Sequence, residues 1–104
     1  MMADARKLFA QGSELFLAKK YGDALEVLRK SYELVPSPNS GLLIARCLRE
    51  LGQPVESSEM FSLVEADARK RVSEGDAKYL KAAEAAVTEG AAVRATIGSI
   101  RIRL

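Results

Sequence analysis

Small and large apolar residues recur at helical spacing on both sides of short turns, and this pattern occurs twice in the chain. The first copy comprises Gly12, Leu15, Tyr21, Ala24, Leu28, Ser31 and Pro36. The second comprises Ile44, Ala45, Leu48, Leu51, Gly52, Ser57 and Phe61. Two antiparallel helices pack in this way, because the small residue admits the neighbouring helix and the large one fills the gap. Ala24 and Ser57 lie 33 residues apart, a period typical of helical repeats.

The hydrophobic spacing predicts an all-α fold of five helices joined by short turns. The expected helices cover residues 3–19, 24–35, 40–51, 55–72 and 77–93. A turn is expected at residues 21–23, and Pro36 and Pro38 should separate the second helix from the third, since proline disfavours helix in the residue before it. Gly52 is placed as a left-handed cap, and a break is expected at residues 73–75. The alanine-rich fifth helix is predicted to cap two antiparallel helix-turn-helix repeats.

The last residues change to the spacing of a β-strand. Ile100, Ile102 and Leu104 alternate with Ser99, Arg101 and Arg103. The chain is therefore divided into a helical domain at 1–93 and a linker with a short terminal strand at 94–104. An isolated strand lacks a partner. Three readings stay open: it adds to another chain, it begins a further domain, or it is disordered.

Composition indicates a single small globular domain. Of the 104 residues, 48% are apolar, and no apolar run approaches the ~20 residues that span a bilayer. The N-terminus has no basic segment followed by an apolar one, so we expect a cytoplasmic protein, or a periplasmic or envelope protein if an export signal has been removed. Cys47 is the one cysteine, read either as a buried core residue or as a reactive thiol beside Arg46.

The chain contains no histidine. This removes the usual general base, the commonest transition-metal ligand and the His-activated nucleophiles. No glycine-rich phosphate loop or metal-ligand cluster is present in the sequence. The carboxylates, among them Glu56, Glu59 and Asp67, are spread along helices without a convergent pair. We therefore expect no catalytic site, no cofactor and no metal.

The net charge of +2 is distributed unevenly. Residues 1–93 carry 13 basic and 14 acidic side chains, whereas residues 94–104 carry three arginines and no acid. Three arginines make a modest patch at most, and the run Arg69–Arg71 is read as a solvated helix end. No nucleic-acid partner is expected.

The paired-helix pattern resembles the tetratricopeptide repeat. Two repeats match over about 70 residues. In the first repeat the matching residues are Leu8, Gly12, Leu15, Tyr21, Ala24, Leu28, Ser31 and Pro36. In the second they are Ile44, Ala45, Leu48, Leu51, Gly52, Ser57, Phe61 and Val64. Gln11 and Pro54 depart from the usual leucine and aromatic residue. The resemblance implies a stack of helical hairpins that binds other proteins.

A narrower similarity concerns the runs 32–40 and 45–52 together with Lys78 and Tyr79. They are similar to repeat proteins from large bacterial genomes, such as those of myxobacteria. In those proteins the helical module is commonly exported to the envelope, and a short β-domain follows a strand much like residues 97–104. Beside the chain as given, this similarity adds two expectations: a fragment of a longer protein, or a protein from which an export signal has been removed.

In tetratricopeptide folds the first helix of each pair lines a concave groove. Carried over to this chain, that surface comprises Arg6, Phe9, Ser13, Phe16, Leu17, Asn39, Leu42, Arg46, Arg49 and Glu50. Arginine pairs bidentately with carboxylates, so an acidic or C-terminal peptide with an apolar anchor is the implied partner. Phe9 and Ser13 stand where some family members carry the lysine and asparagine that clamp a peptide carboxylate, so that clamp is not reproduced.

Two alternatives to a peptide-binding module remain. The first is that Phe9, Phe16 and Leu17 belong to the core, while Arg46 and Arg49 form a solvated face. The second is a structural protein that forms a homo-oligomer, because two repeats are fewer than the three or so usually needed for stability. The strand residues that would mediate this association are Ile100, Ile102 and Leu104.

Overall fold

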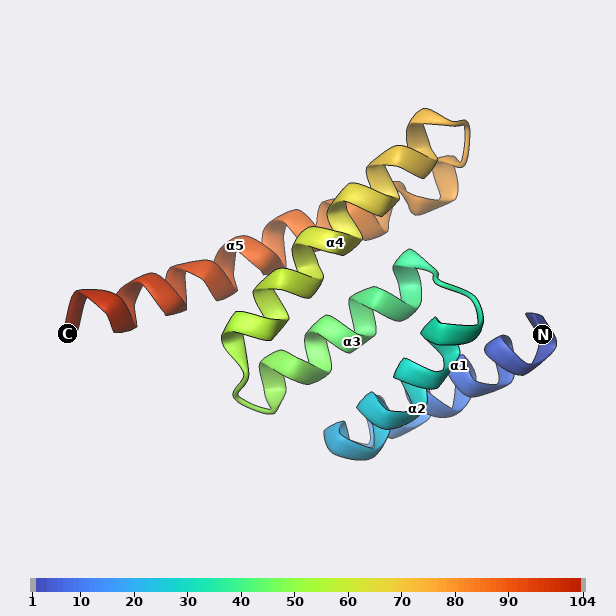
Figure 1. Cartoon of the computed structure of the whole chain (residues 1–104), viewed down its shortest axis with the longest axis horizontal. Helices are drawn as coiled ribbons and strands as arrows, with labels where there is room; N and C mark the ends of the chain where they lie inside the picture. The colour runs from blue at the N-terminus through green and yellow to red at the C-terminus, as the bar shows by residue number, and fades with distance from the viewer. Residues whose placement is uncertain (1, 104) are drawn as a thin grey trace.

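The computed structural model describes residues 2–103 of the chain, with the side chains of residues 3–97. The described residues form five α-helices, of which the first four are joined by connections of three residues each, and a longer connection at residues 74–79 leads to the fifth. The helices are α1 (Met2–Leu17), α2 (Tyr21–Leu34), α3 (Pro38–Glu50), α4 (Pro54–Ser73) and α5 (Leu80–Arg103), with a short 3-10 helix η1 (Ala77–Tyr79) before α5. The predicted all-α architecture is confirmed, and successive helices run in opposite directions (Figure 1).

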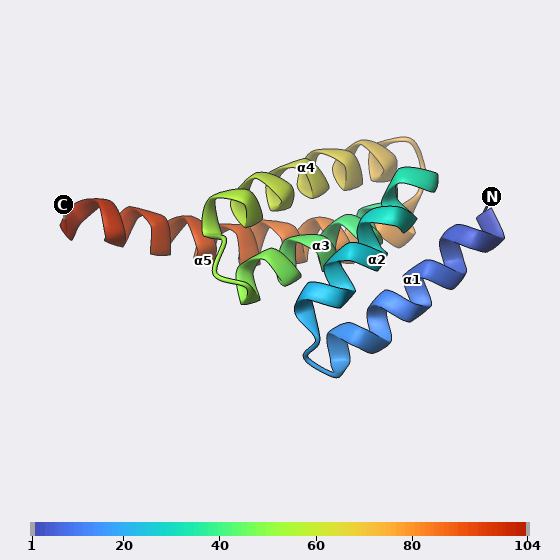
Figure 2. The same cartoon turned by 60° about the horizontal axis from the view of Figure 1, so that its bottom comes forward.

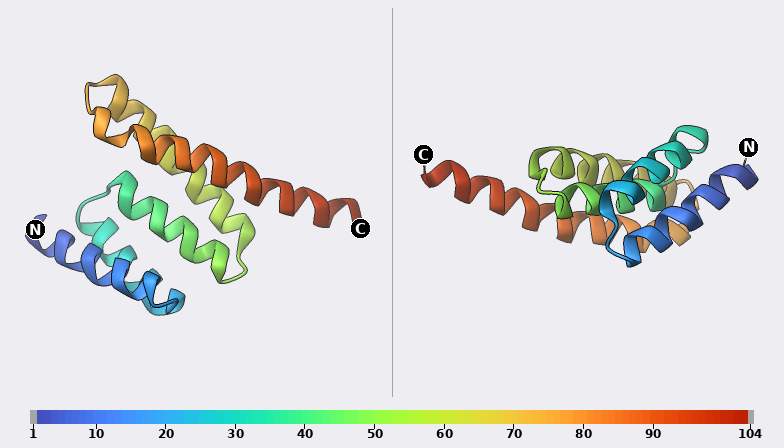
Figure 3. Two further views of the ribbon diagram at one scale, coloured as in Figure 1. Left: turned by 180° about the vertical axis from the view of Figure 1, so that it is seen from behind. Right: turned by 90° about the horizontal axis from the view of Figure 1, so that it is seen from below.

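The helices form two hairpins and an additional long helix. Helices α1 and α2 make the first hairpin, α3 and α4 make the second, and α5 packs mainly along α4. The first hairpin lies beside α3, so that α3 is flanked by α2 on one side and α4 on the other (Figure 2). The C-terminal end of α5 projects beyond the other helices, as both views of Figure 3 show.

Two left-handed residues set the ends of α1 and α3. Lys19 has φ 64°, and the amide of Lys20 donates to the carbonyl of Leu15 at 2.9 Å, which closes a Schellman motif. The turn therefore lies at residues 18–20, and the turn predicted at residues 21–23 is wrong. The Schellman motif ends α1 at Leu17, and α2 already begins at Tyr21. Gly52, with φ 76°, takes the cap position that the sequence predicts.

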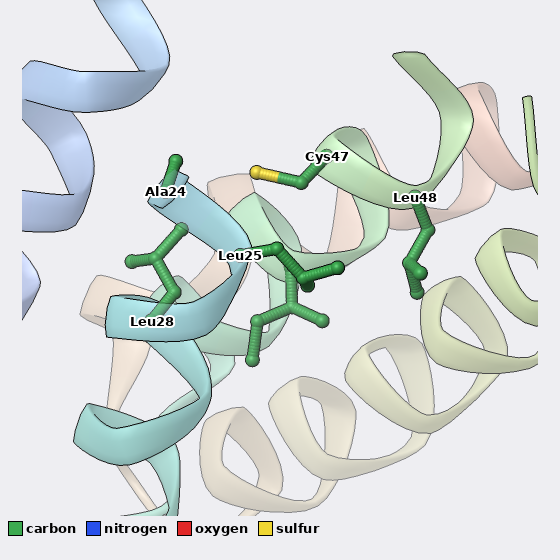
Figure 4. Close-up of a cluster of buried hydrophobic side chains, with 6 residues drawn as sticks. Ala24, Leu25, Leu28, Cys47 and Leu48 are labelled. Atoms are coloured by element: carbon green, nitrogen blue, oxygen red, sulfur yellow. The ribbon is translucent and has the colours of Figure 1, made fainter. Parts of the chain in front are cut away.

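The core consists of two main hydrophobic clusters that meet at α3. The first is formed by side chains of α2 and α3, of which Figure 4 labels Ala24, Leu25, Leu28, Cys47 and Leu48. Its buried members are Ala24, Leu25, Leu28, Ile44, Cys47 and Leu48. The second joins α3, α4 and α5 through Leu42, Ala45, Phe61, Val64, Ala86 and Val93. Because α3 contributes to both clusters, only a narrow strip of it faces solvent.

Small residues bring the helices of each hairpin close together. A β-carbon added at Gly12 of α1 would lie 2.5 Å from the Cδ2 atom of Leu28 in α2. One added at Gly41 of α3 would lie 2.8 Å from Val64 in α4. These distances are shorter than real β-carbon contacts, so a larger residue at either crossing would force the opposing side chain to move.

In each hairpin, a buried serine of one helix forms a hydrogen bond to the backbone of the other helix. The Ser31 hydroxyl of α2 donates to the Ala5 carbonyl of α1, and the Ser57 hydroxyl of α4 donates to the Ala45 carbonyl of α3, both at 2.8 Å. Both serines are almost fully buried, so the hydroxyls need these partners. Each bond ties one helix of a hairpin to the backbone of the other.

The terminal strand is not formed. Helix α5 continues to Arg103, so Ile100 and Ile102 lie on a helix, and Leu104 is outside the described residues. An isolated strand leaves its backbone groups without partners, whereas a helix satisfies them within the segment. No proline interrupts residues 80–103, and glycine costs a helix only about 1 kcal/mol. The division of the chain at residue 93 stays a prediction, and α5 runs across it without a break.

We expect Gly12→Ala to lower the free energy of unfolding by about 1–2 kcal/mol, because overpacking against Leu28 exceeds the gain in helix propensity. Gly22→Ala is the matched control, since an added β-carbon there meets nothing within 4 Å. The control should leave stability unchanged or raise it by up to about 1 kcal/mol. Urea unfolding followed by circular dichroism measures both. Equal stabilisation by the two substitutions would contradict the close crossing of α1 and α2.

Candidate protein-binding surface

The residues predicted to bind a partner do not form one continuous surface. Leu42 is 9% exposed and lies in the second cluster, so it is a core residue and not part of a surface. Phe16 stacks edge-on against Tyr21, with ring centroids 5.4 Å apart, and packs on the first cluster. Leu17 is 79% exposed at the end of α1, and Ser13 is half-buried. The remaining residues fall into an ion cluster and a cleft.

The ion cluster joins α3 to α5 through Glu89. Arg46 donates to both carboxylate oxygens of Glu89, from Nε at 2.9 Å and from Nη2 at 2.7 Å. Arg49 donates to Oε1 of Glu89 at 2.9 Å and also to Glu50 at 3.0 Å. The two arginines are thus paired within the chain. The sequence led us to expect a partner carboxylate at these arginines, but Glu89 of α5 supplies that carboxylate.

The charge state of Glu89 follows from this geometry. Burial alone would raise the pKa of Glu89, but hydrogen bonds and charges from Arg46 and then Arg49 outweigh it and hold the pKa below its usual value. The Glu89 side chain is 23% exposed. The carboxylate is therefore charged at neutral pH and neutralises much of the positive charge expected on this part of α3.

A surface cleft of about 470 Å³ lies beside the N-terminal end of α3. Three of the predicted residues line it, namely Arg6 and Phe9 from α1 and Asn39 from α3. The other lining residues are Ala5, Ser31, Val35, Pro36, Ser37, Ser40, Arg71, Asp76, Lys78 and Tyr79. The cleft therefore combines an apolar floor with basic groups that come from α1, the end of α4 and η1.

Arg71 holds one wall of this cleft in place. It donates from Nη2 to the Pro36 carbonyl at 2.9 Å and from Nε to Asp67 at 3.1 Å. Its guanidinium also lies over the Tyr79 ring, 5.3 Å from the centroid, and the Lys78 ammonium lies at the same distance. Arg71 thereby connects the loop between α2 and α3 to α4 and η1.

The sequence did not identify Arg71, Lys78 or Tyr79 as parts of a binding surface. The run Arg69–Arg71 reads as a solvated helix end, and this holds for Arg69 and Lys70, which are exposed. The helical periodicity of α4 is the signal that separates Arg71 from Arg69 and Lys70. Arg71 follows Ala68 on the buried side of α4, but its approach to Pro36 depends on how the second hairpin packs and cannot be read locally.

Cys47 is fully buried in the first cluster, and Figure 4 shows its sulfur directed toward α2. Burial, and to a lesser extent the charge of Glu50, raises the pKa of the Cys47 thiol to about 11. The thiolate is the reactive form, so the thiol is inert at neutral pH. Of the two interpretations of Cys47, the core residue is the one that the structure supports.

The described residues contain no group of three or more histidine, cysteine, aspartate or glutamate side chains placed to hold a metal ion. Among the helices of residues 2–103, none is long and apolar enough to cross a membrane. Comparison of the chain with models of protein families, with curated proteins and with solved structures gives no match. The resemblance to tetratricopeptide repeats therefore rests on the residues of the chain alone.

We expect Glu89→Gln to lower the free energy of unfolding by about 1–2 kcal/mol at pH 7, because two half-buried guanidinium groups lose a charged acceptor. Glu84→Gln is the control, as Glu84 is exposed on the same helix. Urea unfolding at low ionic strength measures the difference. A loss no larger than that of the control would show that the ion cluster does not stabilise the contact between α3 and α5.

The effect of Glu89→Gln should depend on pH. The folded-state pKa of Glu89 lies below its unfolded value of about 4.3. Its contribution to stability is therefore complete above that value and is lost as pH falls through the folded pKa. The difference in unfolding free energy between the wild type and Glu89→Gln should shrink when the same titration is repeated near pH 3. A difference that stays constant down to this pH would contradict the assigned charge state.

Proposed function

We propose that this protein is a non-catalytic protein-interaction module of the tetratricopeptide type, which binds a peptide segment of a partner on the surface formed by α1 and α3. The observation that carries the proposal is the cleft of about 470 Å³ beside α3. Arg6, Phe9 and Asn39 come from the two helices that line the groove in tetratricopeptide folds, and all three border this cleft. A cleft that combines apolar and polar groups suits a peptide side chain.

The two hairpins pack by similar means, which supports a stack of helical hairpins. Each has a glycine where its helices approach closely and a buried serine that donates to the opposite backbone, although these residues are not related by the 33-residue period, under which Gly12 corresponds to Ala45 and Ser31 to Val64. Helix α5 packs along α4 and also contacts α3, as expected of the first helix of a third hairpin. Helices α1, α3 and α5 are then the equivalent helices of the stack, and Glu89 links two of them.

The arginines of α3 are less suitable than the cleft as the main binding site. Arg46 and Arg49 are already paired with Glu89, so a partner carboxylate would have to displace an internal one. In the cleft, by contrast, Arg6 and Lys78 form no ion pair with any of the described side chains. The proposed contact surface therefore centres on Phe9 and its neighbours.

Selection from a displayed random-peptide library tests the proposal. We expect a family of enriched peptides that bind wild type and lose at least about tenfold in affinity to Phe9→Ala, because that substitution removes the apolar floor. Leu17→Ala is the matched control: Leu17 belongs to the same predicted groove but lies outside the cleft. Circular dichroism verifies that both variants fold. Failure to enrich any peptide family, or equal loss in the two variants, would contradict the proposed site.

A further inference from the structure

We propose that the cleft beside α3 receives an acidic peptide segment, with carboxylates placed among Arg6, Arg71 and Lys78 and a neighbouring apolar side chain on the floor made by Phe9 and Val35. This inference rests on the proposed function and specifies its partner by charge. It differs from the sequence-based expectation, which placed the acidic partner on Arg46 and Arg49. The cationic groups are on different elements, so the site exists only in the folded chain.

The balance of charge in the cleft favours an acidic partner. Three cationic side chains border the cleft, and Asp76 is the acidic residue among the lining groups. Arg71 is also paired with Asp67, which leaves a surplus of one positive charge. Within the described side chains neither Arg6 nor Lys78 forms an ion pair. Carboxylates that approach these two groups gain charge-assisted hydrogen bonds without displacing an internal partner.

The donors of Arg71 remain partly available. A guanidinium has five N–H groups, and Arg71 uses Nε for Asp67 and one Nη2 hydrogen for the Pro36 carbonyl. Neither of these two bonds uses the hydrogens on Nη1, and the Tyr79 side chain lies beside the guanidinium as a further internal partner. Because the two internal bonds fix the orientation of the guanidinium, little side-chain entropy is lost when a carboxylate binds to it.

The floor of the cleft fits an apolar side chain next to the acidic group. Phe9, Val35 and Pro36 contribute apolar surface, and the Tyr79 ring lies close to both Arg71 and Lys78. An aromatic or aliphatic side chain of the partner would cover this surface and exclude water from the adjacent ion pairs. Partial desolvation strengthens such pairs relative to those on an open surface. The recognised sequence therefore combines acidic residues with one apolar anchor.

Fluorescence anisotropy with a labelled peptide tests the inference. The probe is a peptide with a central phenylalanine flanked by glutamates, and its control replaces every glutamate with glutamine. We expect the acidic probe to bind wild type at least about tenfold more tightly than the control, with affinity falling as salt is raised. Equal binding of the two peptides would overturn the charge preference.

Two variants on α1 locate the site. Arg6→Glu and Lys7→Glu change the net charge equally at two exposed, consecutive positions of α1, but only Arg6 borders the cleft. We expect Arg6→Glu to weaken binding of the acidic probe about tenfold or more, and Lys7→Glu to change it by less than about threefold. Lys78→Glu in η1, which borders the cleft, and Lys70→Glu in α4, which does not, provide a second pair. Equal effects within both pairs would show that the acidic segment does not bind in the cleft.

The outcomes separate this inference from the proposed function. Library peptides that need Phe9 but are neutral and insensitive to Arg6→Glu would retain the interaction module and overturn the acidic partner. A library selection that enriches nothing, together with no binding of the acidic probe, would overturn both. Binding of the acidic probe that depends on Arg46 and Arg49, and not on Arg6, would return the acidic site to the α3 arginines and overturn the inference.

Discussion

The burial of α3 on two opposite sides is the constraint on which the rest of the structure depends. Ile44 and Leu48 pack toward α2, while Leu42 and Ala45 pack toward α4 and α5. Burying one aliphatic side chain of this size contributes about 1.5–3 kcal/mol, so the two clusters hold this short helix firmly and position the helices around it. What remains exposed is a strip that begins at Asn39. The functional surface of α3 is limited to this strip and to what its neighbours bring to it.

The sequence predicted the helical hairpins because their packing depends on local features. Gly12 is recognised in the sequence as the small residue of a helix pair by its helical spacing, and a β-carbon there would collide with Leu28 of α2. Gly41, at the crossing of α3 and α4, was not predicted. Gly52 at a helix end is equally local, because glycine adopts the left-handed conformation without strain. Local signals of this kind were enough to predict the five helices and the short connections between them.

The features that the sequence did not predict depend on contacts between residues far apart in the chain, or on whether a second strand is present to pair with the first. Glu89 lies 43 positions from Arg46, and nothing in the local pattern links them. The alternation of Ile100 and Ile102 indicated a strand, but a strand needs hydrogen bonds from another segment, whereas the end of α5 obtains them within the helix. The cleft is even harder to predict, because its lining residues come from several elements. Arg71 takes its place there by donating a hydrogen bond to the Pro36 carbonyl in the loop between α2 and α3.

A cationic side chain contributes more readily to a binding surface when the chain itself does not already pair it with a carboxylate. A sequence displays Arg6, Arg46 and Arg49 as equivalent basic residues on equivalent helices. In the fold, Arg46 and Arg49 share an internal carboxylate, and their donors are already directed inward. Arg6 lies beside an apolar floor and two further cations from other elements. A guanidinium that is satisfied by its own chain stabilises the fold, and one that borders a cleft without an internal partner can give specificity to binding. The position of the counter-charge thus matters more than the position of the arginine.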